Sequence, residues 1–458
     1  CPADKIRALP RVLSALIFFP RGGSAHDARA LAKNLPTHGW DVTVLSGSRS
    51  DLRGGRGDAC RFYEGLNPHA VDFTEALRAE DPLAADPPMH PSFEDRRDAP
   101  DRVMARLDDD QFERQVATWS RALGDAGAEQ ADVLHLNHLT PINEAAHRVA
   151  PDVPVVGHLH GTELLMLEAI EEGADWPHAA RWADRMREWA GRCERLVLLS
   201  ASAEERAERL LGADPQRCVV LPNGFDPDTF HPRDVERDAH WRRHLVEEPQ
   251  GWSPDTDPGS VGYSAEEIER LTGATILMSV GRFTSVKRTP LLIEAFAEAR
   301  ERAKHPAALV VVGGHPGEWE DEHPAETVER IGARDVFLAG WHDHDELPAF
   351  LNASDVLALA SVREQFGQVL VEAMACAVPP IAVDRFGPAE IVDDGRTGWL
   401  VGPDDKDALR DAIVAAIDDP DERAKRADAA RRDAEDRFSW PALAGRLAET
   451  LDDVVKGR

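Results

Sequence analysis

Residues 361–375 read SVREQFGQVLVEAMA, and they join a predicted strand to a predicted helix. The strand is the apolar run at 353–360, and the helix is indicated by apolar residues at helical spacing from Val369 to Met374. The first N–H groups of a helix have no internal partner and carry the positive end of its dipole, so they favour a bound phosphate. Gly367, at the junction, would let that backbone come close to a ligand.

Two carboxylates stand in this stretch, eight residues apart. Glu364 precedes the predicted helix and Glu372 lies about one turn inside it. Both can accept hydrogen bonds from sugar hydroxyls, as ionised carboxylates do. Because the same two charges would repel a diphosphate, the cations of a sugar-nucleotide site must come from another part of the chain.

Those cations are predicted in residues 280–288, which read VGRFTSVKR. The stretch follows a buried-looking strand at 274–280, and it offers Arg282 and Lys287 just after Gly281. The lysine side chain ends in a compact ammonium group, whereas the arginine side chain ends in a planar guanidinium group. We expect both side chains to neutralise a diphosphate.

Together the two stretches resemble the retaining glycosyltransferases of family 4, a class that includes sucrose and glycogen synthases. The mark of that family is Glu, seven residues, Glu, with Gly-Arg and Lys upstream. A lone pair of glutamates at this spacing is common in acidic chains, and the order of all the parts is what makes the pattern specific. The resemblance implies the α/β GT-B fold, in which two Rossmann-like, doubly wound domains face each other across a cleft.

The resemblance also implies an activity and its residues. A sugar, expected to be a hexose, would pass from a nucleoside-diphosphate sugar to a hydroxyl acceptor with retention at the anomeric carbon, without a metal or cofactor. Glu364 would hold hydroxyls of the donor sugar, and Glu372 the ribose. The residues expected to be catalytic are His160, Arg282, Lys287 and Glu364. Those expected to bind the donor are Gly22, Gly23, Gly314, Trp341, His342, Phe366, Gly367, Gln368, Val369 and Glu372.

A glycine loop stands between a strand and a helix near the start of the chain. The strand is predicted at 12–19 and the helix at 25–35, with Gly22 and Gly23 between them. The spacing is not Gly-x-Gly-x-x-Gly, so a nicotinamide or flavin site is not supported. The glycines either make a tight turn or, as the resemblance implies, face the donor phosphates and the acceptor.

His160 follows a predicted strand at 153–159, and ligands of open α/β sheets gather beyond the carboxyl ends of strands. The resemblance implies that this histidine contacts the donor sugar; the alternative is a structural role. Three more histidines nearby lack metal-ligand spacing such as His-Glu-x-x-His, and packing or acceptor contacts are expected of them: His135, His138 and His158.

Strands and helices alternate in two blocks, which predicts parallel sheets covered by helices. The first domain is expected at 1–228, a linker with a surface insertion at 229–273, and the second domain at 274–437. By resemblance, the helix at 438–458 packs back on the first domain, and the loop at 341–346 brackets the nucleobase. The Pro- and Asp-rich residues 82–101 are expected to form an exposed loop, either a solvated insertion or an acceptor-side flap.

Composition limits the partners and the compartment. The 458 residues carry a net charge of −30, which argues against binding nucleic acid or an anionic membrane. Five scattered cysteines without a Cys-x-x-Cys pair indicate reduced thiols and neither a disulfide framework nor a zinc site. Reduced thiols favour a cytoplasmic location. No apolar run is long enough to span a bilayer.

Two other functions stay open at this stage. A nucleotide-sugar epimerase on the same fold would need no acceptor. A non-catalytic sugar-nucleotide-binding protein would bind the donor without turnover. The donor sugar, its base and the acceptor are not fixed by the sequence.

Overall fold

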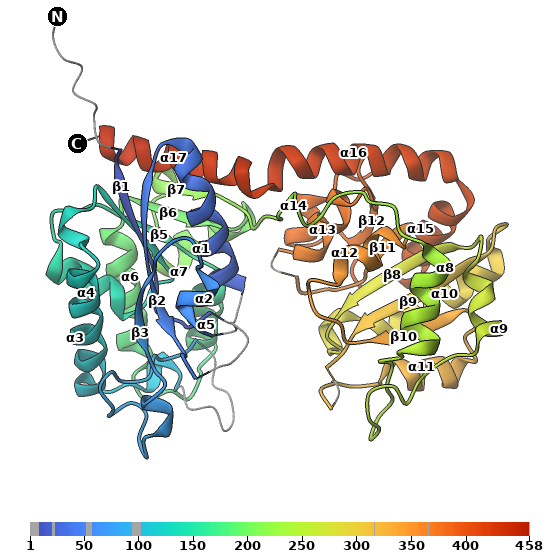
Figure 1. The fold of residues 1–458 in the computed structure, drawn as a ribbon, viewed down its shortest axis with the longest axis horizontal. Helices are drawn as coiled ribbons and strands as arrows, with labels where there is room; N and C mark the ends of the chain where they lie inside the picture. The colour runs from blue at the N-terminus through green and yellow to red at the C-terminus, as the bar shows by residue number, and fades with distance from the viewer. Residues whose placement is uncertain are drawn as a thin grey trace, which may run out of the picture. The chain divides into compact units, whose positions relative to one another are not determined.

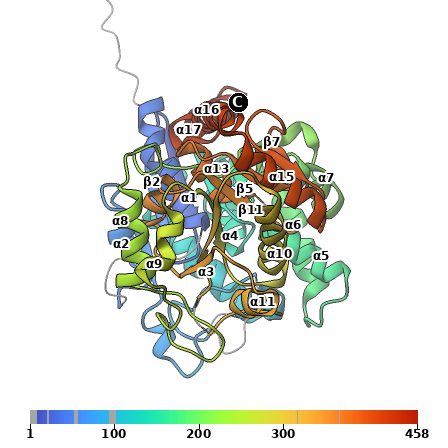
Figure 2. The same ribbon diagram turned by 90° about the vertical axis from the view of Figure 1, so that its right-hand side faces the viewer.

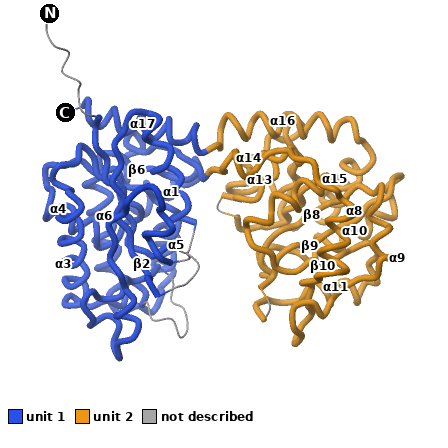
Figure 3. Tube along the Cα trace, in the orientation of Figure 1, with its two compact units in different colours: residues 1–223, 440–458 blue, residues 224–439 orange. Residues whose placement is uncertain are grey.

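The computed structural model describes residues 9–20, 23–51, 57–93, 102–315, 317–364 and 366–457. The chain divides into two compact units, one of residues 1–223 with 440–458 and the other of residues 224–439 (Figure 3). Each is an α/β unit with its own parallel sheet and its own core.

Unit 1 contains a parallel sheet in the order β3-β2-β1-β4-β5-β6-β7 (Figure 1). Its strands are β1 (Arg11–Leu16), β2 (Asp41–Ser48), β3 (His69–Asp72), β4 (Val133–Asn137), β5 (Val155–His158), β6 (Arg195–Leu198) and β7 (Cys218–Val220). Its helices are α1 (Gly23–Asn34), α2 (Ala59–Phe62), α3 (Asp109–Asp125), α4 (Pro141–Val149), α5 (Thr162–Glu171), α6 (Ala179–Arg192), α7 (Ser202–Leu211) and α17 (Trp440–Lys456). Short helical turns are η1 (Leu35–His38), η2 (Ala76–Arg78), η3 (Met104–Arg106), η4 (Ala128–Gln130) and η5 (Pro215–Arg217).

Unit 2 contains a parallel sheet in the order β10-β9-β8-β11-β12-β13. Its strands are β8 (Thr275–Gly281), β9 (Ala307–Gly313), β10 (Val336–Gly340), β11 (Val356–Leu359), β12 (Pro380–Val383) and β13 (Trp399–Val401). Its helices are α8 (Arg237–Arg242), α9 (Ala265–Ile268), α10 (Thr289–Arg302), α11 (Pro324–Ile331), α12 (Leu347–Asn352), α13 (Gln368–Ala375), α14 (Gly387–Ile391), α15 (Lys406–Asp418) and α16 (Pro420–Phe438). Short turns are η6 (Arg243–Glu247), which is π-helical, η7 (Glu269–Leu271) and η8 (Ser285–Lys287).

Both sheets are covered by helices on both faces, as Figures 1 and 2 show within each unit. Successive residues of a strand point to opposite faces. In β8, Ile276 and Met278 belong to one apolar cluster, whereas Leu277 belongs to another. The near-continuous apolar strands predicted from the sequence are therefore buried on both sides, as is usual in parallel sheets.

Chain order reverses at the same place in both sheets. In unit 1, β1 lies between β2 and β4; in unit 2, β8 lies between β9 and β11. Ligands of doubly wound folds bind beyond the carboxyl ends of the strands at this switch point. The loops after β1 and β4, and those after β8 and β11, are therefore where functional side chains are expected.

The last helix packs on unit 1. Leu443, Leu447 and Leu451 of α17 lie in one apolar cluster with Val12 of β1 and Leu31 of α1. These leucines recur every four residues, which places them on one face of the helix. The residues from Trp440 onward thus complete the core of unit 1.

Two expectations about loops differ from the structure. The division between units lies at residues 223 and 224, not at 228, and residues 229–273 belong to unit 2, where Trp241 and Leu271 are buried in its core. The segment looked like a surface insertion because its apolar residues are scattered among charges. Within the presumed exposed loop at 82–101, Met89 and Phe93 are buried, and residues 94–101 lie outside the described part of the chain.

Two smaller findings concern membranes and thiols. None of the described helices is long and apolar enough to cross a membrane. The four cysteines in the described residues are free thiols, namely Cys60, Cys193, Cys218 and Cys376.

Candidate functional site

The switch point of unit 2 brings together the two stretches that the sequence singled out. β8 leads into η8, which ends at Lys287, and β11 leads into the loop that carries Glu364. The two loops are joined by a backbone hydrogen bond of 2.9 Å from the N–H of Val362 to the carbonyl of Val286. Residues 76 apart in the chain are thereby held side by side.

Lys287 and Glu364 form an ion pair. Their Nζ and Oε2 atoms are 2.5 Å apart, and the side chains are 22% and 21% exposed. Arg282, the second predicted cation, is exposed, and no partner within the described ranges holds its guanidinium. The site therefore offers one cation that already neutralises a carboxylate and one that is available to a ligand.

The start of α13 lies beside this pair. Gly367 precedes the helix with φ +104°, a conformation that residues with a Cβ rarely adopt. A Cβ at this position would lie 2.9 Å from Cδ1 of Leu370 and 3.5 Å from Cγ of Glu364. Phe366 is buried, with its ring centroid 6.0 Å from that of Phe438. Glycine is thus required for the backbone to pass close to Glu364.

No described side chain caps this end of α13. The helix begins at Gln368, followed by Val369, so their backbone N–H groups belong to the first turn and have no carbonyl partner within the helix. An anion is favoured at such an end. The uncapped turn and Lys287 therefore supply two sources of positive potential around Glu364.

Glu372 is buried, with a side chain only 2% exposed. Its Oε1 accepts a hydrogen bond from Nε2 of His344 at 2.8 Å and another from Nε2 of Gln368 at 3.0 Å. The hydrogen bond to Glu372 raises the pKa of His344, although burial opposes the shift. Glu372 therefore lies deeper than Glu364 and is already held by two donors.

Two other residues of unit 2 that are predicted to bind the donor, Gly314 and Trp341, differ in how accessible they are to a ligand. Gly314 donates its N–H to the carbonyl of Gly281 at 3.0 Å and accepts from Nε1 of Trp252 at 2.9 Å, and a Cβ would lie 2.2 Å from Phe283. The structure thus gives Gly314 a packing role. Trp341 is 42% exposed, which leaves its ring open to a ligand.

A cavity of about 350 Å³ borders the loop that follows β8, but neither Lys287 nor Glu364 lines it. Its lining includes several carboxylates: Glu294, Glu320, Asp321, Glu322 and Asp404. Such a surface repels a diphosphate. We therefore assign the anion site to the Lys287 side of the loop and not to this cavity.

In unit 1, His160 lies beyond the carboxyl end of β5, in a buried polar cluster. Its Nε2 donates to Oδ1 of Asn137 at 3.0 Å, and its Nδ1 lies 3.5 Å from Oδ2 of Asp27. The amide of Asn137 is oriented by a hydrogen bond from Nδ2 to the carbonyl of Ala15. Because an amide oxygen only accepts, the neutral imidazole of His160 carries its proton on Nε2.

Burial keeps this pair neutral. It raises the pKa of Asp27 to about 8 against an opposing effect of His138, and it lowers the pKa of His160 to about 3. Glu163 behaves differently. Burial raises the pKa of its carboxyl group, but the attraction and hydrogen bond of His138, whose Nδ1 is 2.6 Å from Oε1 of Glu163, together with smaller effects, lower the pKa overall. Near neutral pH the His160–Asp27 pair is uncharged.

The glycine loop of unit 1 is only partly described. Gly22 lies outside the described residues. Gly23 is the first residue of α1, and a Cβ there would meet no described atom within 4 Å. Crowding therefore does not explain a glycine at position 23, and its predicted contact with the donor stays a prediction.

Family models match both halves of the chain. The model described as Glycosyltransferase Family 4 matches residues 21–229, and the one described as Glycosyl transferases group 1 matches residues 264–433. The D-inositol 3-phosphate glycosyltransferase of Kineococcus radiotolerans is 31% identical over 322 residues, which cover 67% of this chain and 68% of that protein. The chain belongs to the family-4 glycosyltransferases. The family and the fold expected from the sequence are confirmed.

Two further proteins resemble this glycosyltransferase over most of its length. The glycogen synthase of Mycobacterium tuberculosis strain H37Rv is 26% identical over 420 residues, covering 86% of this chain and 92% of that protein. The structure of HepE from Anabaena, solved in complex with UDP and glucose, superposes with a TM-score of 0.63 at 19% identity, covering 96% of this chain and 99% of that one. The second likeness shows the shared fold.

Three residues of this glycosyltransferase were missed by sequence reasoning. Asp27 lies in α1, far from His160 in the chain, and nothing in its surroundings suggests a buried carboxyl group. Asn137 ends β4 and could have been found by the rule that polar residues at strand ends face ligands. His344 lies in the predicted nucleobase loop, but its contact with Glu372 depends on the fold.

Proposed function

We propose that this glycosyltransferase moves a hexosyl unit from a nucleoside-diphosphate sugar to a hydroxyl acceptor, with retention of configuration at the anomeric carbon. The observation that carries the proposal is the Lys287–Glu364 pair beside the uncapped start of α13. The HepE structure was solved with UDP and glucose, and the Kineococcus relative is named for glycosyl transfer to inositol 3-phosphate, which supports this class of donor and acceptor.

The chemical demand on the enzyme is to stabilise a diphosphate as it leaves. The bond from the anomeric carbon to the phosphate oxygen breaks while a bond forms to the acceptor oxygen, and the acceptor's proton passes to the departing phosphate. Lys287, Arg282 and the first-turn amides of α13 supply positive potential where that negative charge grows. No base and no metal ion is required by this scheme.

The ion pair gives this scheme a specific form. In this structure, Lys287 is neutralised by Glu364. An incoming diphosphate would compete for the ammonium, and Glu364 would then be free to accept hydrogen bonds from hydroxyls of the donor sugar. Donor binding therefore exchanges one partner of Lys287 for another instead of burying a new charge.

The predicted partners in unit 1 are neutral groups. His160 and Asp27 carry no charge near pH 7, so they suit hydroxyl groups better than phosphates. We infer that His160 contacts the donor sugar. The cytoplasmic location expected from the thiols stays a prediction.

A donor screen tests the function. The purified chain is incubated with UDP-, ADP- and GDP-sugars and with inositol phosphates or short glucans, in EDTA and in Mg²⁺. We expect release of one nucleoside diphosphate that depends on an acceptor, persists in EDTA and gives a product of unchanged anomeric configuration by NMR. Conversion of the donor without an acceptor would favour the epimerase, and binding without release would favour a non-catalytic protein.

A further inference from the structure

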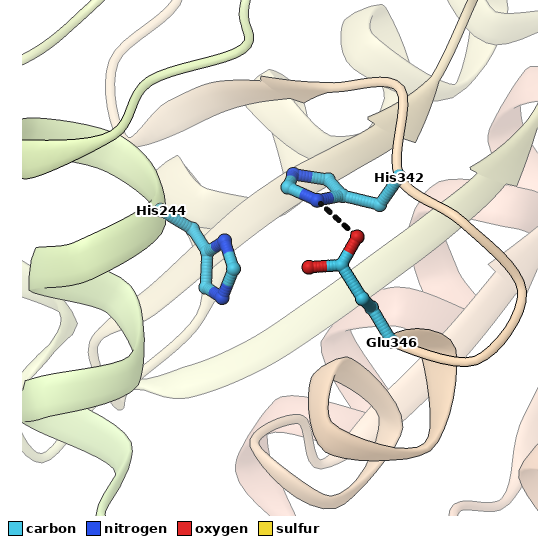
Figure 4. Close-up of side chains that lie close together, drawn as sticks. All are labelled: His244, His342 and Glu346. Atoms are coloured by element: carbon cyan, nitrogen blue, oxygen red, sulfur yellow. Dashed lines mark hydrogen bonds and ion pairs between the residues drawn. The ribbon is translucent and has the colours of Figure 1, made fainter.

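A second cluster of ligand-type side chains lies in unit 2, and of its three members only His342 is also among the residues expected to bind the donor. His244 belongs to η6, His342 belongs to the loop after β10, and Glu346 directly precedes α12 (Figure 4). One ligand atom of each lies within 4.8 Å of the others. No metal site is expected from the sequence, because His244 and His342 are 98 positions apart and match no ligand-spacing motif.

The hydrogen bonds of His342 determine which of its nitrogens is free. Its Nε2 lies 3.2 Å from the carbonyl of Ala339, which can only accept, so in the neutral ring Nε2 carries the hydrogen. Its Nδ1 then presents a lone pair to Oε2 of Glu346 at 3.3 Å. Two acceptors face each other, and the contact becomes favourable only with a proton or a cation between them.

His244 supplies a third side chain that could coordinate a cation. The residue is 7% exposed, and no described residue hydrogen-bonds to either nitrogen of its ring. The ring centroids of His244 and His342 are 4.9 Å apart, and Figure 4 shows both rings beside the carboxylate. Burial lowers the pKa of His244 to about 4, so its imidazole is neutral near pH 7, the form that binds metals.

We propose that His244, His342 and Glu346 bind one divalent transition-metal cation of the zinc class. Two imidazole nitrogens and one carboxylate are a zinc-type ligand set, whereas Mg²⁺ and Ca²⁺ require oxygen ligands. The hydrogen bond from His342 to the Ala339 carbonyl is the outer contact that orients ligating histidines. Glu346 is 46% exposed, which leaves solvent access for a water as fourth ligand.

The bound ion would tie η6 to the loop at 341–346. That loop carries Trp341 and His342, which are expected to lie near the nucleobase. The cation would therefore stiffen the edge of the donor site without contributing to sugar transfer. This differs from a catalytic metal, and turnover in EDTA is expected to continue.

The test is a titration of the full chain, stripped with EDTA and dialysed, with Zn²⁺ and separately with Mg²⁺. Calorimetry should show one equivalent of Zn²⁺ and no Mg²⁺ at this site, and Zn²⁺ should raise the melting temperature. His244→Gln and Glu346→Gln should each weaken Zn²⁺ binding by more than the roughly 10- to 100-fold that loss of an outer contact costs. Glu346 is exposed, so its variant should fold normally.

Matched controls separate this site from surface binding. Asp345→Asn removes the neighbouring carboxylate of the same loop, and Cys60→Ser removes an exposed thiol. Both should bind Zn²⁺ as the parent does. Zn²⁺ binding that is unchanged in His244→Gln and Glu346→Gln, or the absence of saturable binding, would overturn the proposal and leave a proton between His342 and Glu346.

Discussion

Both units place ionisable residues beyond the carboxyl ends of their parallel strands, yet they treat charge in opposite ways. In unit 1 the His160–Asp27 pair is buried and neutral, because burial raises the pKa of the acid and lowers that of the base. In unit 2 the Lys287–Glu364 pair keeps a charged geometry with about a fifth of each side chain exposed. A charge can be kept where water still reaches it, whereas a buried group without a close counter-charge gives up its charge.

The difference indicates which unit holds the anionic part of a ligand. A diphosphate needs fixed positive potential, which unit 2 supplies with Lys287, Arg282 and the start of α13. The neutral His160–Asp27 pair of unit 1 offers hydrogen bonds but no such potential. Substitutions should therefore affect stability in one unit and ligand binding in the other.

The largest effect on stability is expected from Asp27→Asn. The folded state keeps Asp27 protonated up to a pKa of about 8, whereas the unfolded chain loses this proton near pH 4. The wild type therefore loses stability as the pH rises from about 4 to about 8. The amide of Asp27→Asn does not ionise and so removes this loss. At pH 7 the variant should have a free energy of unfolding that is higher by up to about 4 kcal/mol. Urea unfolding at several pH values measures it.

The matched control in unit 2 is Glu364→Gln. Because this ion pair is partly exposed, its loss should change the free energy of unfolding by less than about 1 kcal/mol at any pH. If Asp27→Asn left the pH dependence unchanged, or if Glu364→Gln were the more disruptive change, the contrast between the two pairs would be wrong.

A smaller effect, on kinetics, distinguishes the two glutamates. Glu364 is expected to contact the part of the donor sugar that changes on the way to the transition state, so Glu364→Gln should lower kcat. Glu372 should hold the ribose throughout, so Glu372→Gln should raise the donor KM about tenfold if about 1.4 kcal/mol of hydrogen bonding is lost. Steady-state kinetics on both variants measures this. The reverse pattern would mean that the two roles are exchanged.

The smallest expected effect on stability concerns the backbone conformation just after α13. Ala377 adopts φ +58° just after this helix. Ala377→Gly should relieve the strain of a left-handed alanine and stabilise the chain by up to about 1 kcal/mol. Ala424→Gly, in the exposed part of α16, should instead destabilise by roughly 0.5–1 kcal/mol. Thermal melts of the two variants should shift in opposite directions.

The sequence predicted the features that local pattern encodes. Apolar runs followed by helical spacing identified most strands, and the strand-to-helix turns located Lys287, Glu364 and Gly367 at the switch point. Side-chain contacts between residues far apart in the chain could not be predicted in this way. The contacts of Asp27 with His160 and of His344 with Glu372 depend on which strands become neighbours.

Burial was hardest to predict where apolar residues are sparse. Trp241 and Leu245 lie one helical turn apart among charged residues, so residues 229–273 looked like surface until packing showed otherwise. The same segment contributes His244 to the cluster with His342 and Glu346. A misjudged surface segment thus concealed both a piece of the core and a ligand set.

The central claim, that Lys287 holds the diphosphate of the donor, is tested most directly by calorimetry. ADP, GDP and UDP are titrated into the wild type to find the preferred nucleotide, and that diphosphate and its nucleoside are then titrated into Lys287→Ala and Lys287→Arg. Loss of a charged hydrogen bond worth about 1.5–3 kcal/mol should weaken the diphosphate roughly 10- to 150-fold and leave the nucleoside nearly unchanged, with poor rescue by arginine. An equal loss for diphosphate and nucleoside would contradict the account.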